Sequence, residues 1–145
     1  MALVADSGAV YALYDRGDRN HRAVRQAVAT EEGAILIPAA VLAEIDYLLR
    51  IRLGTVAEVQ FLEGIEKGAF TIEPFTLDDA SFCRKLLAKY RELGVDLADA
   101  SVAAVAERRG ISRLLTVDER HFRAIRAANG KPFTLLPADS RGVSK

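Results

Sequence analysis

The sequence has very few of the residues that indicate a disulfide scaffold, a zinc site or a membrane protein. Cys83 is the single cysteine among 145 residues, so no disulfide can form within the chain, and with two histidines it makes a poor zinc set. No apolar run approaches the roughly 18 residues that a membrane-spanning helix needs. No basic segment precedes the opening apolar run, which Asp6 interrupts, so no secretory signal is indicated. We therefore expect a soluble, cytoplasmic protein.

An excess of charge of either sign is also lacking, because 20 basic side chains balance 20 acidic ones. Without a global positive field, a nucleic acid has to be bound by a local patch. Apolar residues, by contrast, make up half of the chain, which suffices for the core of one domain. We predict a single domain over residues 1–137 and a C-terminal tail over residues 138–145, whose composition favours fraying.

Short apolar runs alternate with longer segments of helical period along the whole chain. This alternation is typical of an α/β fold with a mostly parallel sheet. The runs predict about five strands, and the segments between them predict about seven helices. The predicted strands cover residues 2–5, 34–37, 70–72, 114–117 and 133–136, the last as an edge strand before Pro137.

Four acidic residues stand beside these apolar segments, where a carboxylate costs free energy unless it is paired or holds a cation. Asp6 follows the first predicted strand and Asp118 follows the fourth, so both are expected at the carboxyl-terminal edge of the sheet. Glu44 and Asp99 are expected in the first or second turn of helices that begin at that same edge. Four carboxylates meeting there repel one another unless a cation neutralises them, and oxygen ligands select Mg²⁺ or Mn²⁺ over Zn²⁺.

Each acid also has a purely structural explanation. Asp6 and Asp118 can cap the helices that follow them, and Asp96 with Asp99 has the pattern of a capping box. Glu44 is less easily explained, because its spacing places it on or beside the apolar stripe of its helix rather than opposite that stripe. The set of four therefore favours a metal site that activates water for phosphoryl chemistry, although no single member does.

The segments that carry the four acids resemble the successive acidic motifs of PIN-domain nucleases and, more closely, those of the VapC-type ribonuclease toxins. The matching segments are residues 4–9, 43–47, 97–101 and 115–122, and the likeness extends from about residue 3 to residue 137. The resemblance implies a three-layer α/β/α PIN-like domain with a mostly parallel sheet. It also implies a Mg²⁺- or Mn²⁺-dependent endoribonuclease toxin that hydrolyses phosphodiester bonds of structured RNA, either tRNA or rRNA.

The resemblance assigns a role to each acid and to the hydroxyls beside the first and last of them. All four acids are the implied catalytic residues and metal ligands: Asp6 and Asp99 as principal ligands, and Glu44 and Asp118 as supporting ones. Ser7 and Thr116 are expected to orient water or phosphate by hydrogen bonds. No side-chain nucleophile is required. His121 lies inside the last motif and is interpreted as a surface or RNA-side contact rather than a general base.

Two sets of arginines at about helical spacing are candidates for contacts with RNA phosphates. The sets are Arg16, Arg19, Arg22 and Arg25, and Arg120, Arg123 and Arg126. Solvated helix faces explain both sets equally well. On the RNA-binding interpretation, charge reversal at Arg19 or Arg120 weakens RNA cleavage without unfolding the domain.

The resemblance further implies two protein partners, a cognate VapB-type antitoxin and a second copy of the chain in a homodimer. Val59, Phe61 and Leu62 in the helical segment 56–65 are candidates for such contacts, although each also fits an internal core role. Two other functions stay open. The first is a catalytically inert PIN-fold module that binds RNA or protein. The second is a phospho-acceptor or phosphatase domain, which is disfavoured because Ser7 and Gly8 follow Asp6 where such domains place another acid.

Overall fold

A five-stranded parallel sheet forms the centre of the computed structural model, which describes residues 2–127 and 129–140. Along the sheet the strands lie in the order β3-β2-β1-β4-β5, and every adjacent pair is parallel. Their bounds are β1 Ala2–Ala5, β2 Ala34–Pro38, β3 Thr71–Glu73, β4 Arg113–Leu115 and β5 Thr134–Leu136. The expected parallel sheet is confirmed, with β5 at one edge.

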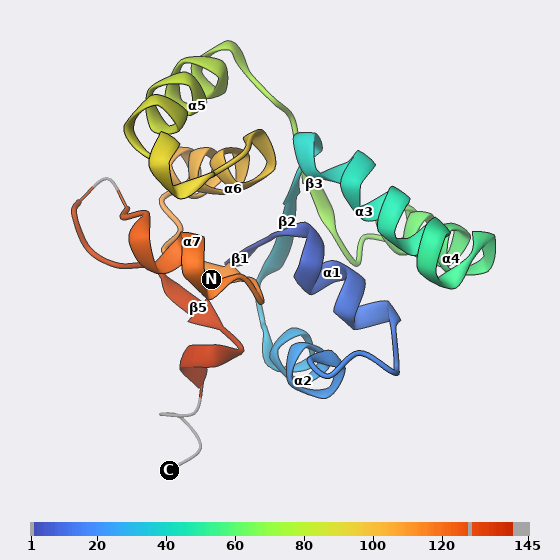
Figure 1. Ribbon diagram of the computed structural model, residues 1–145. Coiled ribbons are helices and arrows are strands. Elements are labelled where there is room, and N and C mark those ends of the chain that lie inside the picture. Colours follow the sequence, from blue (N-terminus) through green and yellow to red (C-terminus); the bar gives the residue numbers. More distant parts are fainter. Residues whose placement is uncertain (1, 128, 141–145) are drawn as a thin grey trace.

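Helices cover both sides of this sheet and complete three layers (Figure 1). In the described part of the chain the α-helices are α1 Ser7–Tyr14, α2 His21–Thr30, α3 Ala39–Leu53, α4 Thr55–Glu66, α5 Leu77–Lys89, α6 Leu97–Arg109 and α7 Glu119–Ala124. A 3₁₀ turn, η1, spans Arg91–Leu93 between α5 and α6. In Figure 1, α5 and α6 lie on one side of the sheet, and α1 to α4 lie on the other. The α/β/α arrangement is therefore confirmed.

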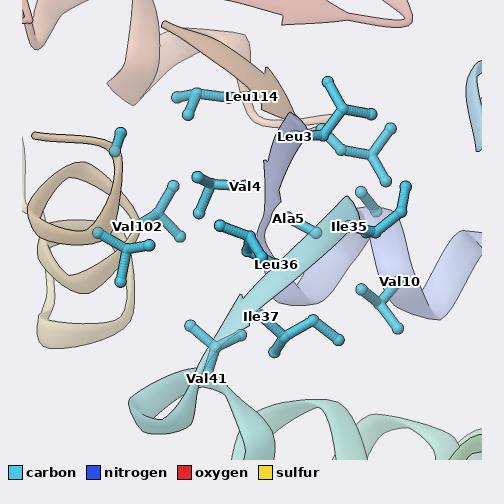
Figure 2. Close-up of a cluster of buried hydrophobic side chains, with 14 of the residues drawn as sticks. Leu3, Val4, Ala5, Val10, Ile35, Leu36, Ile37, Val41, Val102 and Leu114 are labelled. Atoms are coloured by element: carbon cyan, nitrogen blue, oxygen red, sulfur yellow. The ribbon is translucent and has the colours of Figure 1, made fainter. Parts of the chain in front are cut away.

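The two central strands are apolar throughout because both of their faces are covered. Leu3, Val4 and Ala5 of β1 have no exposed surface. Successive side chains of a strand point to opposite faces, so each strand contributes to two core layers. Figure 2 shows Val4 on the side of Val102 from α6, and residues of β2 divided in the same way. Burial of β1 on both faces fixes the position of its C-terminal end in the sheet. It therefore also fixes the position of the next residue, Asp6.

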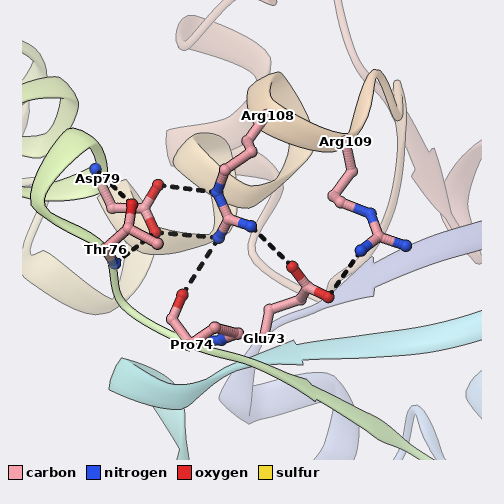
Figure 3. Close-up of polar contacts among 6 residues, drawn as sticks. All are labelled: Glu73, Pro74, Thr76, Asp79, Arg108 and Arg109. Atoms are coloured by element: carbon pink, nitrogen blue, oxygen red, sulfur yellow. Dashed lines mark hydrogen bonds and ion pairs between the residues drawn. The ribbon is translucent and has the colours of Figure 1, made fainter.

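A charged cluster fastens the C-terminal end of α6 to β3 and α5 (Figure 3). Arg108 donates to Glu73 at 2.9 Å and to Asp79 at 3.0 Å, and Arg109 also donates to Glu73 at 3.0 Å. Burial by itself raises the pKa of Asp79, but hydrogen bonds from Arg108 and from the Thr76 amide outweigh burial and hold that pKa below its ordinary value. Asp79 is thus kept ionised, and the two buried carboxylates tie α6 to β3 and α5.

The C-terminal end of the predicted domain and the start of the predicted tail lie close together. Asp139 accepts hydrogen bonds from Arg123 at 2.7 Å and from the Leu135 amide at 2.7 Å. These bonds attach the first part of the segment expected to fray. Residues 141–145 of that segment lie outside the described residues. Among the described residues, no helix is long and apolar enough to cross a membrane.

Candidate active site

Asp6 begins the site, at the point where β1 ends and α1 starts. As expected for a helix cap, its Oδ1 accepts a hydrogen bond from the Ala9 amide at 3.1 Å. Only 7% of the residue is exposed. The pKa of Asp6 is raised to about 7, mainly by burial and to a smaller extent by the negative charges of Asp99 and Asp118. The hydrogen bonds from Thr116 and Ala9 act in the opposite direction. Asp6 is therefore both a structural cap and a carboxylate whose charge is costly.

Thr116 joins Asp6 to Asp118 through its hydroxyl group. The hydroxyl donates a hydrogen bond to Oδ2 of Asp6 and accepts one from the Asp118 amide at 2.9 Å. Because β1 and β4 are neighbours in the sheet, the residues after both strands meet at one edge. The order of strands reverses direction between β1 and β4, and open α/β sheets bind their ligands at such a reversal.

Asp99 reaches this edge from the first turn of α6. The expected capping box is present: Asp96 Oδ1 accepts from the Asp99 amide at 2.9 Å, and Asp99 Oδ2 accepts from the Asp96 amide at 3.4 Å. Burial, and then the negative charge of Asp96, raises the pKa of Asp99 to about 6. The neighbouring His121 and the Asp96 amide act in the opposite direction. Asp99 therefore both forms the capping box of α6 and belongs to the acidic cluster.

His121 lies between two of the acids, which overturns its interpretation as a surface residue. Its Nδ1 is 3.0 Å from a carboxylate oxygen of Asp99 and 3.0 Å from one of Asp118, and its side chain is only 16% exposed. Its Nε2 lies 3.2 Å from the carbonyl oxygen of Leu93 in η1. The sequence did contain a signal for this position. Asp118 caps α7, and a residue three positions after a cap lies directly above it.

Glu44 lies farther out than the other acids. It is in the second turn of α3, as expected, and because it is exposed it borders the buried stripe of Val41, Ile45 and Leu49 without lying within it. Its Oε1 accepts a hydrogen bond from the Ser7 hydroxyl at 2.8 Å. Glu44 is therefore connected to the cluster through the residue that follows Asp6.

The donor set of this site fits a hard divalent cation. Among the described residues, Asp99, Asp118 and His121 each offer a ligand atom within 4.8 Å of the others. The negative charges of Asp99 and Asp118 contribute to the raised pKa of Asp6, so the Asp6 carboxylate belongs to the same acidic cluster. Carboxylate oxygens suit Mg²⁺ and Mn²⁺. A cation among them would offset the cost of burying the charged carboxylates and their mutual repulsion, which raise the pKa values of Asp6 and Asp99.

The two arginine sets differ in how they are engaged. Arg16, Arg19, Arg22 and Arg25 are all exposed. In the second set, Arg123 donates to Asp139 and to Glu119, whereas Arg120 and Arg126 are exposed. Hydrogen bonds to Asp139 raise the already high pKa of the Arg123 guanidinium. Arg123 therefore serves to hold α7 against the C-terminal segment.

Comparison with known proteins identifies the family of the chain. The profile of the PIN domain family matches residues 3–128. The chain belongs to the PIN-domain family. This PIN domain is 30% identical over 135 residues to Ribonuclease VapC26 of Mycobacterium tuberculosis, a match that covers 93% of this chain and 100% of that relative.

Solved structures share the fold of this PIN domain. VapC20 of M. tuberculosis, a toxin that cleaves the sarcin–ricin loop, superposes with a TM-score of 0.72 at 24% identity and covers 77% of this chain and 86% of its own. VapBC2 of Rickettsia felis, solved with a DNA fragment from its promoter, gives a TM-score of 0.67 at 16% identity, over 93% of this chain and 97% of its own. FitAcB of Neisseria gonorrhoeae gives 0.65 at 20% identity, over 92% and 97%.

Proposed function

We propose that this PIN domain is a metal-dependent endoribonuclease and the toxin of a toxin–antitoxin pair. The observation that carries the proposal is the group of buried or half-buried acids at the reversal point of the sheet, Asp6, Asp99 and Asp118. Membership of the PIN family and 30% identity over the full length of Ribonuclease VapC26 support the same chemistry. Both features are those expected of a hydrolase that acts on phosphodiester bonds.

Each residue of the site has a proposed role in holding the cation. Asp6 and Asp99 are the principal ligands for Mg²⁺ or Mn²⁺, and Asp118 and Glu44 support them. A divalent cation held there supplies a bound water of lowered pKa and neutralises charge on the scissile phosphate. Thr116 fixes the direction of the Asp6 carboxylate, and Ser7 fixes that of Glu44.

His121 is a positioning residue in this proposal. Its Nδ1 contacts both Asp99 and Asp118, and its Nε2 is held against the Leu93 carbonyl. An imidazole fixed on both sides keeps the two carboxylates at a constant separation. Partners of this kind orient metal ligands and tune how tightly the metal is held.

The proposed substrate is structured RNA, either tRNA or rRNA, in the cytoplasm. RNA is recognised mostly at loops and bulges, whose bases and backbone are accessible to a protein surface. VapC20, which shares this fold, is a toxin that cleaves the sarcin–ricin loop. We assign the same class of target to this chain, without assigning the same loop.

The proposed antitoxin is of the VapB type and docks on the hairpin of α3 and α4. That hairpin carries exposed large apolar side chains: Tyr47, Ile51, Leu53, Val56, Val59 and Leu62. Exposed apolar side chains in such number on one hairpin are characteristic of a protein contact. Phe61 of the same helix is buried against the rings of Tyr14 and Phe70, so of the three residues predicted for this contact only Val59 and Leu62 are available.

Cleavage of total cellular RNA by the purified, antitoxin-free protein tests the proposed activity. Reactions contain Mg²⁺, Mn²⁺ or EDTA, and a parallel series uses the double variant Asp6→Asn, Asp99→Asn, shown by circular dichroism to be folded. Discrete fragments that disappear with EDTA and with the variant are expected. Sequencing of the cut ends then identifies the target.

Absence of cleavage with every metal, together with retained RNA binding, would replace this proposal by the inert RNA-binding module. Light scattering on the same sample tests the homodimer, for which a mass of twice 15.8 kDa is expected. Co-purification with the cognate antitoxin tests the docking face. Val59→Asp and Leu62→Asp are expected to abolish co-purification while RNA cleavage is retained.

A further inference from the structure

A groove runs along α5, on the side that faces the segment following α7. Its lining residues on α5 and at the helix end recur at helical spacing: Phe82, Lys85, Leu86, Lys89 and Tyr90. Arg126, Ala127 and Gly130 line the opposite side, and the volume is about 460 Å³. A second hollow of about 260 Å³ shares Phe82, Arg126 and Ala127 and continues toward the C-terminal end of α6. We call the two together the α5 groove.

Cations that form no ion pair with the described carboxylates line this groove in a protein of zero formal net charge. Lys85, Lys89 and Arg126 are exposed, and no carboxylate among the described residues forms an ion pair with any of them. Elsewhere among the described residues several arginines form ion pairs with carboxylates, as Arg108 does with Glu73 and Asp79. One acid, Glu107, lines the far hollow. The groove is therefore a local positive patch of the kind that the neutral composition requires for a polyanion.

Aromatic surface accompanies these cations. Phe82 lines both parts of the groove and is only partly buried, and the Lys89 ammonium lies 5.2 Å from the centre of the Tyr90 ring. Cations that follow a backbone, next to aromatic faces on which bases stack, are the common features of grooves for single-stranded nucleic acid. A peptide with an apolar face finds its better match on the hairpin of α3 and α4.

Both walls of the groove are connected along the chain to elements that also carry residues of the acidic site. On one wall, α5 passes through Tyr90 into η1, whose Leu93 carbonyl is 3.2 Å from His121 Nε2. On the other wall, α7 leads from its cap Asp118 to Arg126 two residues beyond its end. A six-residue helix is about 9 Å long. Tyr90 and Arg126 thus place this end of the groove within a few residues of His121's contact and of the cap Asp118.

We propose that the α5 groove binds the single-stranded segment of RNA that flanks the scissile phosphate, with Lys85, Lys89 and Arg126 contacting its phosphates. This inference rests on the proposed endoribonuclease function and adds to it the path of the substrate. The bases of that segment meet Phe82 and the Tyr90 ring. Binding along the groove depends on backbone charge, so it contributes affinity for any sequence, and the choice of cleavage site is made elsewhere.

Binding of a fluorescein-labelled, unstructured oligoribonucleotide tests the groove, measured by anisotropy in EDTA over a series of salt concentrations. The test variant is Lys85→Gln with Lys89→Gln. The matched control is Arg84→Gln with Lys67→Gln, which removes the same charge from exposed positions outside the groove. The test variant is expected to lose about 10-fold in affinity, and the slope of log K against log salt is expected to fall by about 1.4, or 0.7 for each lost phosphate contact. The control is expected to match the wild type.

Cleavage kinetics separate failure of the groove from failure of the proposed function. With Mg²⁺ or Mn²⁺ and a long substrate, the test variant is expected to raise KM about 10-fold and to leave kcat unchanged, because the groove holds only RNA outside the reacting bond. Retained cleavage with unaltered KM and unaltered oligonucleotide affinity would overturn the groove. Loss of antitoxin binding in place of RNA binding would overturn it equally. Absence of cleavage by the wild-type protein would instead overturn the endoribonuclease.

Discussion

His121 Nδ1 lies 3.0 Å from Asp99 Oδ2, across the space between the N-terminal ends of α7 and α6. The same nitrogen is 3.0 Å from Asp118, so one imidazole sets the spacing of two carboxylates from different elements. The Leu93 carbonyl holds the far side of the ring. Three segments of the chain thus converge on a residue whose position sequence motifs alone did not reveal.

Replacement of His121 by alanine is expected to weaken metal binding and slow RNA cleavage. Loss of a residue that orients metal ligands typically costs 10- to 100-fold, and we expect about 10-fold in both Mn²⁺ affinity and kcat/KM. Isothermal titration with Mn²⁺ and a cleavage assay measure the two quantities. His21→Ala is the control, because the ring of His21 contacts the Ala12 carbonyl in a different part of the molecule. Unchanged Mn²⁺ affinity in His121→Ala would contradict the assigned role.

Replacement of Asp6 by asparagine is expected to stabilise the metal-free protein at alkaline pH. Burial raises the pKa of Asp6 from 3.8 to about 7, so the stability associated with its bound proton is complete below about pH 4 and is lost as the pH rises through 7. From pH 5 to pH 8 the unfolding free energy of the variant should rise by about 2 kcal/mol relative to that of the wild type, and below about pH 4 the two should be close. Urea unfolding in EDTA measures this difference, with exposed Asp78→Asn as the control.

Added metal should reverse that order. Mn²⁺ is expected to raise the melting temperature of the wild type, because a ligand that binds only the folded state stabilises it. The Asp6→Asn variant should show little or no rise. An equal rise in both proteins would remove Asp6 from the set of principal ligands.

Replacement of Thr116 by valine keeps the shape of the side chain and removes its hydroxyl. The Asp118 amide and the Asp6 carboxylate would then each lose a hydrogen-bond partner. The loss occurs in a buried place, because only 1% of Thr116 is exposed. We expect a loss of about 2 kcal/mol in unfolding free energy and a fall in cleavage activity. Thr116→Ser should restore most of both. If valine and serine behaved alike, the hydroxyl would have no part in the site.

Replacement of Arg108 by methionine is expected to destabilise the fold without changing the chemistry of the acidic site. The buried carboxylates of Glu73 and Asp79 would each lose their ion pair with Arg108. The free energy of unfolding is expected to fall by about 3 kcal/mol at pH 7. Because the pKa of Asp79 lies below its ordinary value, the stability that this carboxylate contributes is present above about pH 4 and is lost as the pH falls. The gap between variant and wild type should therefore narrow in acid.

Arg109→Met provides the matched comparison for that measurement. Arg109 is about half exposed and makes a single bond to Glu73, so a loss of about 1 kcal/mol or less is expected. Urea unfolding at pH 7 and at pH 3.5 measures both variants. Equal losses for Arg108 and Arg109 would show that the cluster does not depend on burial.

The fold was predictable because its two central strands are short apolar runs, buried on both faces, whose ends are marked by a polar residue or a proline. Asp6 ends the run of β1, and Pro38 ends β2, so both strands were found to within one residue. The segment after β1 was harder to divide. Its helical spacing did not reveal that the turn between Tyr14 and His21 separates α1 from α2.

The acids of the site were predictable for a different reason. Asp6 and Asp99 lie next to elements that are visible as apolar patterns, so their place at the edge of the sheet followed from the topology. The exposure of Glu44 beside the buried stripe of α3 was less certain, because helical spacing defines a face only to within a third of a turn. The cap Asp118 was a local signal for His121, but the contacts of His121 with Asp99 and Leu93, and the α5 groove, depend on segments far apart in the chain, which no local pattern contains.

The bond between Thr116 and Asp6 joins a residue near the start of the chain to one near its end. During synthesis Asp6 leaves the ribosome early, yet the strand that completes its surroundings, β4, is among the last to appear. A partly made chain therefore carries a first strand whose neighbour β4 and acidic cluster are still missing. The site can therefore be assembled only when translation is almost complete.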